Sequence, residues 1–229
     1  MALFHDNPRI AVVYSNCQTI DSNGCSFGKN KKIFYRGMIF DDMLQNNFIP
    51  PSPTVVMKKE YIHSVGSFLE YKASLDFDML LKLAFRYPFD YVGETLAKYR
   101  IHKQTISLDY ETAYIECCEI LNYWRTQPGC QTTIRSRLIN HAIAMRYYII
   151  GVYSLIQDHK SKKARNNLVR SWRITPSLKA LIFYCLSFMN PHWVGKMMLW
   201  IRKNLGRGII PRQCPSKNRG FGAEVNRNR

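Results

Sequence analysis

Residues 66–102 contain two carboxylates, an arginine and a histidine that could form a polar site. Asp76 and Asp78 lie at the start of an apolar segment with helical spacing, and Arg100 and His102 lie at the end of a segment that alternates like a strand. Carboxylates at a helix start and a cationic pair at a strand end are suitable parts of a polar site. The arginine and the histidine together could bind phosphate or help to hold a metal ion.

The helix that must position the two carboxylates is expected to begin at residue 75. Ser74 is a suitable N-cap, because its hydroxyl can accept a free backbone N–H of the first turn. Asp76 then falls in that turn, where the helix dipole favours a carboxylate. Asp78 points to a different side of the helix, so one carboxylate is expected to serve a site while the other caps or pairs structurally. The alternative, that both only complement the dipole, stays open. The expected buried stripe consists of Leu75, Met79, Leu80, Leu83 and Ala84.

The cationic side chains depend on a strand. A period of two places Lys98, Arg100 and His102 on one face of a strand over residues 96–102. A shorter strand is expected over residues 89–92, with Glu94-Thr95 forming a turn between the two. An exposed strand end without function is the alternative.

Short strands and helices alternate before this region. The apolar run 10–14 predicts a strand buried on both faces, followed by a turn at 21–24, and residues 54–57 predict another strand. The order of these elements predicts an α/β fold.

Two further segments bear on the candidate site. Residues 38–44 predict a helix whose polar side carries Asp41 and Asp42, most simply as solvated residues, with a catalytic role as the alternative. A small helix over 58–65 ends at Gly66, which suits a left-handed C-cap position.

Composition excludes several classes of protein. Of the 229 residues, 46% are hydrophobic and 13% aromatic, which is enough for one sizeable core and too apolar for a disordered chain. The seven cysteines are odd in number and form no Cys-x-x-Cys pair, so a reducing compartment is expected rather than a disulfide framework or a zinc site. No secretory signal is expected from the first residues.

The net charge of +17 comes from one part of the chain. Residues 132–229 carry 19 Lys or Arg against Asp158 and Glu224, whereas residues 1–131 carry 14 charges of each sign. An excess confined in this way predicts an anionic partner. A membrane surface is favoured over nucleic acid, because the cations alternate with large apolar residues. A solvated basic face without a partner is the alternative.

Helical periodicity dominates the second half of the chain. Residues 110–124 and 133–156 predict two helices, and Thr175-Pro176 and Asn190-Pro191 each predict the start of another. These last two helices are short, apolar, tryptophan-bearing and flanked by cations, which suits a membrane interface better than a membrane span. A hydrophobic helical hairpin docked on the globular part is the alternative.

Five segments occur in an order that is itself informative. They are Tyr14-Ser-Asn with Thr19-Ile-Asp-Ser-Asn-Gly24, Phe48-Ile-Pro-Pro-Ser-Pro-Thr-Val-Val-Met-Lys-Lys59, Val65-Gly-Ser-Phe-Leu-Glu70, Leu75-Asp-Phe-Asp-Met-Leu-Leu-Lys82 and Leu96-Ala-Lys-Tyr-Arg-Ile-His102. Together they resemble the later part of the GT-A core of family 2 glycosyltransferases. The helical C-terminal part resembles the extensions of members that assemble polysaccharides.

The resemblance implies a partial GT-A (Rossmann-like) core and an inverting transfer of sugar from a nucleotide-sugar to an acceptor hydroxyl. It places the catalytic base on Asp76, which would take the acceptor proton. Arg100 and His102 fall near the diphosphate or the metal, with His102 as the candidate metal ligand. Gly66 and Glu70 fall on the acceptor-side loop. The complete family fold implies a divalent cation, Mg or Mn.

Two departures from the family pattern matter. Leu75 replaces the glutamate that precedes the family's catalytic aspartate. The nucleotide-binding strands and the Asp-x-Asp metal motif of the family's first half have no counterpart, because Asp76-Phe77-Asp78 matches the later motif in order. The chain is therefore expected to be truncated, inactive alone, and not to bind the cation by itself.

These expectations divide the chain into four parts. Residues 1–108 form the C-terminal half of a GT-A domain, 109–174 a helical extension, 175–205 amphipathic membrane-interface helices and 206–229 a basic disordered tail. The expected partners are a nucleotide-sugar, a glycan or lipid-linked acceptor and an anionic membrane, with nucleic acid disfavoured. The expected location is cytoplasmic, peripheral at the inner membrane face. The alternative function is a non-catalytic membrane-surface binding or assembly module derived from the same fold.

Overall fold

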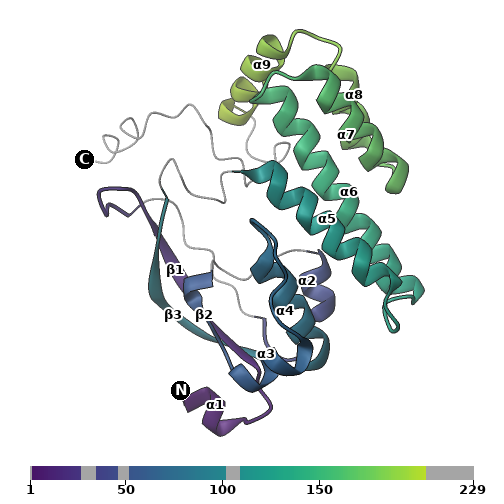
Figure 1. Ribbon diagram of the computed structural model, residues 1–229. Helices are drawn as coiled ribbons and strands as arrows, with labels where there is room; N and C mark the ends of the chain where they lie inside the picture. Colours follow the sequence, from purple (N-terminus) through teal and green to yellow (C-terminus); the bar gives the residue numbers. More distant parts are fainter. Residues whose placement is uncertain (1, 27–34, 46–51, 102–108, 205–229) are drawn as a thin grey trace. The chain divides into compact units, whose positions relative to one another are not determined.

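The computed structural model describes residues 2–26, 35–45, 52–101 and 109–204 (Figure 1). The chain divides into two compact units, Met1–Ile139 and Asn140–Arg229. The helices of the first unit are α1 (Ala2–Asp6), α2 (Phe40–Gln45), the 3-10 turn η1 (Ser52–Thr54), α3 (Lys59–Val65), α4 (Leu75–Arg86) and α5 (Tyr110–Thr126). Helix α6 (Thr133–Ile156) begins in the first unit and continues into the second.

A three-stranded mixed sheet forms the centre of the first unit. β1 (Val12–Ile20) is the middle strand, β2 (Val55–Met57) pairs with it antiparallel, and β3 (Phe89–Arg100) pairs with it parallel. The apolar run that leads into β1 is mostly buried, as a middle strand requires: Ile10, Ala11, Val12 and Tyr14 are buried and Val13 is half-buried. The expected α/β class is confirmed at this level.

β3 is one strand, so the predicted turn at Glu94-Thr95 is wrong. The register shifts on both sides of Asn16, which pairs with Thr95, whereas Ser15 pairs with Val92. The two intervening residues of β3 form a bulge, and the Asn16 side-chain amide donates to the Gly93 carbonyl at 2.9 Å. The bulge lets the strand continue to Arg100 instead of turning back.

Aromatic packing joins three helices of the first unit. The rings of Phe40 (α2), Phe85 (α4) and Trp124 (α5) lie 4.9–5.1 Å apart, centroid to centroid, in edge-on and tilted arrangements. Such pairs add about 0.5–1.5 kcal/mol each beyond the area that they bury. This cluster fixes α4, the helix that carries both candidate carboxylates.

The Tyr14 hydroxyl ties the segment before α2 to the sheet. It donates to the Tyr35 carbonyl at 2.6 Å and accepts from the Tyr35 backbone N–H at 3.1 Å. Burial raises the pKa of Tyr14 from 10.0 to about 12. The folded unit therefore retains this proton at a pH where the unfolded chain has lost it.

Replacing Tyr14 with phenylalanine is expected to lower the free energy of unfolding by about 1–2 kcal/mol, because two hydrogen bonds are lost. The contribution of Tyr14 is fully present below pH 10 and falls as pH rises toward 12, by up to about 1.4 kcal/mol per pH unit. Urea titrations from neutral pH to about pH 11 should therefore give a shallower pH slope for Tyr14→Phe. Tyr148, also raised to about 12 by burial, is common to both proteins and cancels in the comparison. Equal slopes would contradict the assignment.

The second unit is helical. It contains the later part of α6, together with α7 (Ser161–Ile174), α8 (Leu178–Leu186) and α9 (Pro191–Asn204). Their shared core consists of Tyr148, Val152, Leu155, Ala164, Leu168, Ala180, Phe183, Val194 and Met198. No helix in the described part of the chain is both long enough and apolar enough to cross a membrane.

The helix starts predicted from proline are half right. Pro191 begins α9, and the Asn190 side chain accepts from the His192 N–H at 2.9 Å. Thr175, however, ends α7, and α8 is capped instead by Ser177, whose hydroxyl accepts from the Ala180 N–H at 3.2 Å. The cap therefore lies two residues later than predicted: the hydroxyl of Ser177, and not that of Thr175, accepts a backbone N–H of the first turn of α8.

Candidate functional site

The loop between α3 and α4 begins at Gly66. This residue has φ +91° and ψ 163°, a conformation with positive φ that glycine adopts easily. The predicted left-handed C-cap is therefore wrong in ψ, because the chain leaves the helix extended rather than curling back. Glu70 lies further along the loop and is exposed, as are the neighbouring side chains of Phe68 and Leu69. Gly66 and Glu70 thus lie on a loop that is open to solvent.

A carboxylate that sequence reasoning missed holds the end of this loop. Glu116 of α5 is buried and accepts three backbone N–H groups, from Lys72 at 2.8 Å, Ala73 at 2.9 Å and Ser74 at 2.9 Å. Ionised acceptors make the stronger class of hydrogen bond. Glu116 therefore fixes the backbone immediately before α4.

Ser74 does not cap α4 with its side chain, contrary to the prediction. Its hydroxyl donates to the Ala113 carbonyl at 3.0 Å instead, and no side-chain cap bond is made at this position. The reason is competition: α5 lies alongside and offers an acceptor to the hydroxyl, while Glu116 takes the Ser74 N–H. The loop and α4 are therefore fastened to α5 rather than capped locally.

Asp76 lies in the first turn of α4 and is partly exposed. One carboxylate oxygen, Oδ1, accepts the Phe77 backbone N–H at 2.8 Å, and Oδ2 accepts from the Ser52 hydroxyl at 3.0 Å. Ser52 belongs to η1, which lies against β1 and β3. The carboxylate is thus held between the start of a helix and a turn on the sheet.

Asp78 has a different environment. Its side chain is buried, and Oδ2 lies 2.6 Å from Nζ of Lys82, one helical turn away. The separation is that of an ion pair, whereas the same oxygen lacks hydrogen-bond geometry, so we assign a mainly Coulombic contact. Of the two carboxylates, Asp78 is the structural one and Asp76 is accessible. Leu75, predicted to be buried with this helix face, is exposed instead.

Arg100 ends β3 and supports the turn at 21–24. Its Nη1 donates to the carbonyls of Asp21 at 3.0 Å and Ser22 at 2.8 Å. The Asp21 side chain closes the same turn by accepting the N–H groups of Asn23 and Cys25. The other N–H groups of the guanidinium donate to none of the described residues, so they remain available to an anion.

Exposure alternates along the end of β3 as predicted, with Lys98 and Arg100 exposed on one face. His102, predicted on that face and as a metal ligand, lies outside the described residues. No hydrogen bond or ion pair within the described ranges joins Asp76 to Arg100.

The divalent cation that the resemblance implies finds no fitting donor set in the part of the chain that the structure describes. No group of three His, Cys, Asp or Glu side chains there is arranged to hold a metal ion. We therefore assign no step to a metal.

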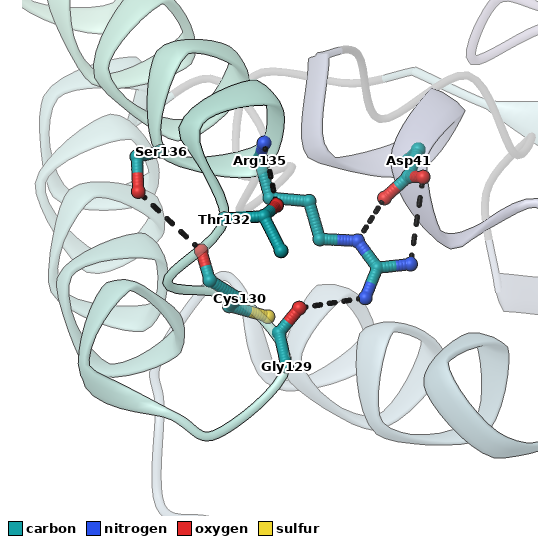
Figure 2. A network of polar contacts seen from close by, with 6 residues as sticks. All are labelled: Asp41, Gly129, Cys130, Thr132, Arg135 and Ser136. Carbon is teal, nitrogen blue, oxygen red and sulfur yellow. Dashed lines mark hydrogen bonds and ion pairs between the residues drawn. The ribbon is translucent and has the colours of Figure 1, made fainter.

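A second polar network, shown in Figure 2, gives Asp41 an ion-pair partner, while its side chain stays about half exposed on the predicted polar side of α2. The Arg135 guanidinium pairs with both Asp41 oxygens, through Nε at 2.7 Å and Nη2 at 3.5 Å, and donates from Nη1 to the Gly129 carbonyl at 2.8 Å. It also lies over the Phe40 and Phe85 rings. The network links α2 to the start of α6 and has a structural role.

No protein-family model matches the chain, and no curated protein matches it. The structure defines a mixed α/β unit followed by a helical unit.

Proposed function

We propose that the chain is the acceptor-side part of an inverting, family 2-like glycosyltransferase of the GT-A class. One contact carries the proposal: the Ser52 hydroxyl donates to the Asp76 carboxylate at 3.0 Å. The two residues come from separate segments that both resemble this family. A hydrogen bond between them supports the view that these segments build one site.

Asp76 is the proposed general base. Its two hydrogen-bond donors set the direction of the carboxylate, and each oxygen keeps a further lone pair for an acceptor hydroxyl. The acceptor oxygen attacks the anomeric carbon of the donor sugar, its proton passes to Asp76, and the nucleoside diphosphate leaves with the electron pair of the broken bond. The configuration at the anomeric carbon is inverted.

The neighbouring elements have supporting roles in this proposal. The exposed loop with Gly66 and Glu70 contacts the acceptor, and its end is held in place by Glu116. The available donors of Arg100 neutralise charge on the leaving diphosphate. The donor-binding strands and the Asp-x-Asp motif are assigned to a segment outside these residues, and the divalent cation belongs to that complete assembly.

The chain by itself is expected to show no measurable binding of nucleotide-sugars. Titration calorimetry with a panel of UDP-, GDP- and dTDP-sugars tests this directly, and tight binding would contradict the assigned division of the site. Sequencing the DNA upstream of the Met1 codon is the companion test. An in-frame stretch that encodes a nucleotide-binding strand and Asp-x-Asp supports the enzyme.

In a polypeptide that carries both halves, Asp76→Asn is expected to lower kcat by about 10²–10⁴-fold, the usual contribution of a general base, with little change in KM. Ser52→Ala should lower kcat about tenfold, because it removes a hydrogen bond that orients the Asp76 carboxylate and leaves the carboxylate itself in place. Asp42→Asn is the matched control on another helix start. Transfer of labelled sugar measures the activity of all three variants. Full activity of the Asp76→Asn protein would contradict the proposal.

A non-catalytic binding or assembly module with the same fold is the second candidate. It accounts for the contacts of Arg100 with the turn at 21–24, because an arginine with a purely structural role makes them without any diphosphate. A promoter and ribosome site directly upstream of Met1, with no sugar transfer, would support it.

A further inference from the structure

Helix α8 has two apolar faces, and only one of them is covered. Ala180 and Phe183 are fully buried in the core of the second unit, where Phe183 meets the Tyr148 ring edge-on at 5.7 Å. Leu178, Leu181 and Ile182 lie on the other side and are exposed, Leu178 by 71%. Their spacing of three and four residues makes one stripe along the helix. Packing within the second unit therefore buries one of the two apolar faces of α8 and leaves the other exposed.

The exposed apolar residues continue beyond the helix. Phe188 and Met189 follow in the turn, and Trp193 lies in the first turn of α9, with Phe188 and Trp193 exposed by 65% and 68%. We call Leu178, Leu181, Ile182, Phe188, Met189 and Trp193 the α8–α9 surface. Large exposed apolar groups in one continuous segment are uncommon in monomers and mark a site of interaction.

Cations border this surface at short range. Cζ of Arg165 lies 4.8 Å from the centroid of the Phe188 ring, and its Nη1 is anchored on the Ser187 carbonyl at 2.9 Å. Nζ of Lys196 lies 5.7 Å from the Trp193 centroid, and Lys179 is exposed next to Leu178. Residues 159–204 contain no Asp or Glu at all. The surface therefore pairs exposed aromatic and aliphatic groups with positive charge only.

We propose that the α8–α9 surface binds the interface of an anionic lipid bilayer. The apolar side chains enter the boundary between headgroups and acyl chains, and Arg165, Lys179 and Lys196 lie at the level of the lipid phosphates. Tryptophan beside a cation is the arrangement that this boundary favours. The inference stands on the second unit alone and does not depend on the proposed sugar transfer.

A lipid surface fits better than a second copy of the chain for an electrostatic reason. Two copies meeting through this surface would bring like charges together, which opposes association. Anionic headgroups neutralise the same charges instead. The helices that carry the surface are too short to cross the bilayer, so binding is expected along its face.

Flotation of the full chain with vesicles tests the proposal. Binding to vesicles of phosphatidylcholine with about 30% phosphatidylglycerol should be about tenfold or more stronger than to phosphatidylcholine alone, and should weaken with added salt. The double variant Leu181→Glu/Ile182→Glu should lose about tenfold or more of this binding, and Lys179→Glu/Lys196→Glu should lose the preference for the anionic lipid. Unchanged circular dichroism confirms that these exposed substitutions leave the helices folded.

Ile134→Glu is the matched control. Ile134 is 72% exposed on α6 within the first unit and lies outside the α8–α9 surface, so this variant should float like the unaltered chain. Equal loss in the control and in Leu181→Glu/Ile182→Glu would overturn the proposal. So would absence of vesicle binding together with a dimer, seen by sedimentation velocity, that the double variant dissociates. Neither result bears on sugar transfer, which the Asp76→Asn assay tests separately.

Discussion

Replacing Glu116 with alanine is expected to lower the free energy of unfolding of the first unit by about 3–5 kcal/mol. The reason is that one buried carboxylate accepts the N–H groups of Lys72, Ala73 and Ser74. Without it, the three backbone donors before α4 lose an ionised acceptor, and water cannot replace it at Ser74, which is buried. Urea denaturation measures the loss, and amide hydrogen exchange should show faster exchange at these three residues than elsewhere in the unit.

Glu119→Ala is the control for this prediction. Glu119 lies on the same helix and is exposed, so its removal should change stability by less than about 0.5 kcal/mol. Glu116→Gln should give an intermediate loss, because its single carbonyl oxygen accepts at most two of the three bonds while its amide adds donors. If Glu116→Ala were as stable as Glu119→Ala, the carboxylate would not be what holds the loop. In a polypeptide that carries both halves of the proposed enzyme, the proposed sugar transfer should fall as well, since the same loop leads into the first turn of α4 that carries Asp76.

The second large effect is expected at Gly151 in α6. A Cβ at this position would lie 2.7 Å from Cγ of Leu168 and 3.2 Å from the Ala164 carbonyl oxygen, where α7 crosses. Helix propensity alone would make Gly151→Ala stabilising by about 1 kcal/mol. Overpacking against a fully buried leucine costs about 1–3 kcal/mol and outweighs it. Gly151→Val adds two more methyl groups and should cost about 3 kcal/mol, measured by thermal and urea unfolding of the second unit.

Gly195→Ala is the control that separates the cost of overpacking from the gain in helix propensity. Among the described residues, the Cβ added there meets only the Ile156 carbonyl oxygen, at an ordinary contact distance of 3.6 Å. This variant should therefore be neutral or more stable by up to about 1 kcal/mol, the opposite sign from Gly151→Ala. Leu168→Ala is itself expected to cost about 2–5 kcal/mol, because Leu168 is fully buried. In that background, Gly151→Ala should cost less than it does in the unaltered chain, because the removed side chain makes room. A stabilised Gly151→Ala protein would show that α6 and α7 do not approach as closely as described.

Local physical rules made much of the fold predictable. Helix α6 runs over the predicted residues 133–156, and α5 differs from its prediction only at its end, because apolar periodicity over a long segment depends on the segment alone. The turn at 21–24 is closed by the side chain of its own first residue, Asp21. The exposure of Lys98 and Arg100 on one face of β3 follows from the pleat of a strand. The α/β class follows from the order of these elements.

Long-range contacts decided the rest. Asn16 converts a predicted turn into a bulge by reaching Gly93, and Asp41 finds Arg135, 94 residues away. Nothing local to either segment encodes these pairings. The exposure of Leu75 and of one face of α8 likewise depends on which elements pack against them. The exposed face of α8 is the basis of the proposed lipid binding.

The candidate site divides in the same way. The two-residue spacing of Asp76 and Asp78 was sufficient to predict that they face different sides of one helix, since that is a property of helix geometry. Which of them is accessible was decided by tertiary packing, which buries Asp78 beside Lys82 and brings Ser52 to Asp76. Local sequence patterns were therefore enough to predict most of the elements and the direction of their side chains, but not the continuity of β3. Which side chains meet follows from the packing of the whole fold, because burial depends on partners that are remote along the chain.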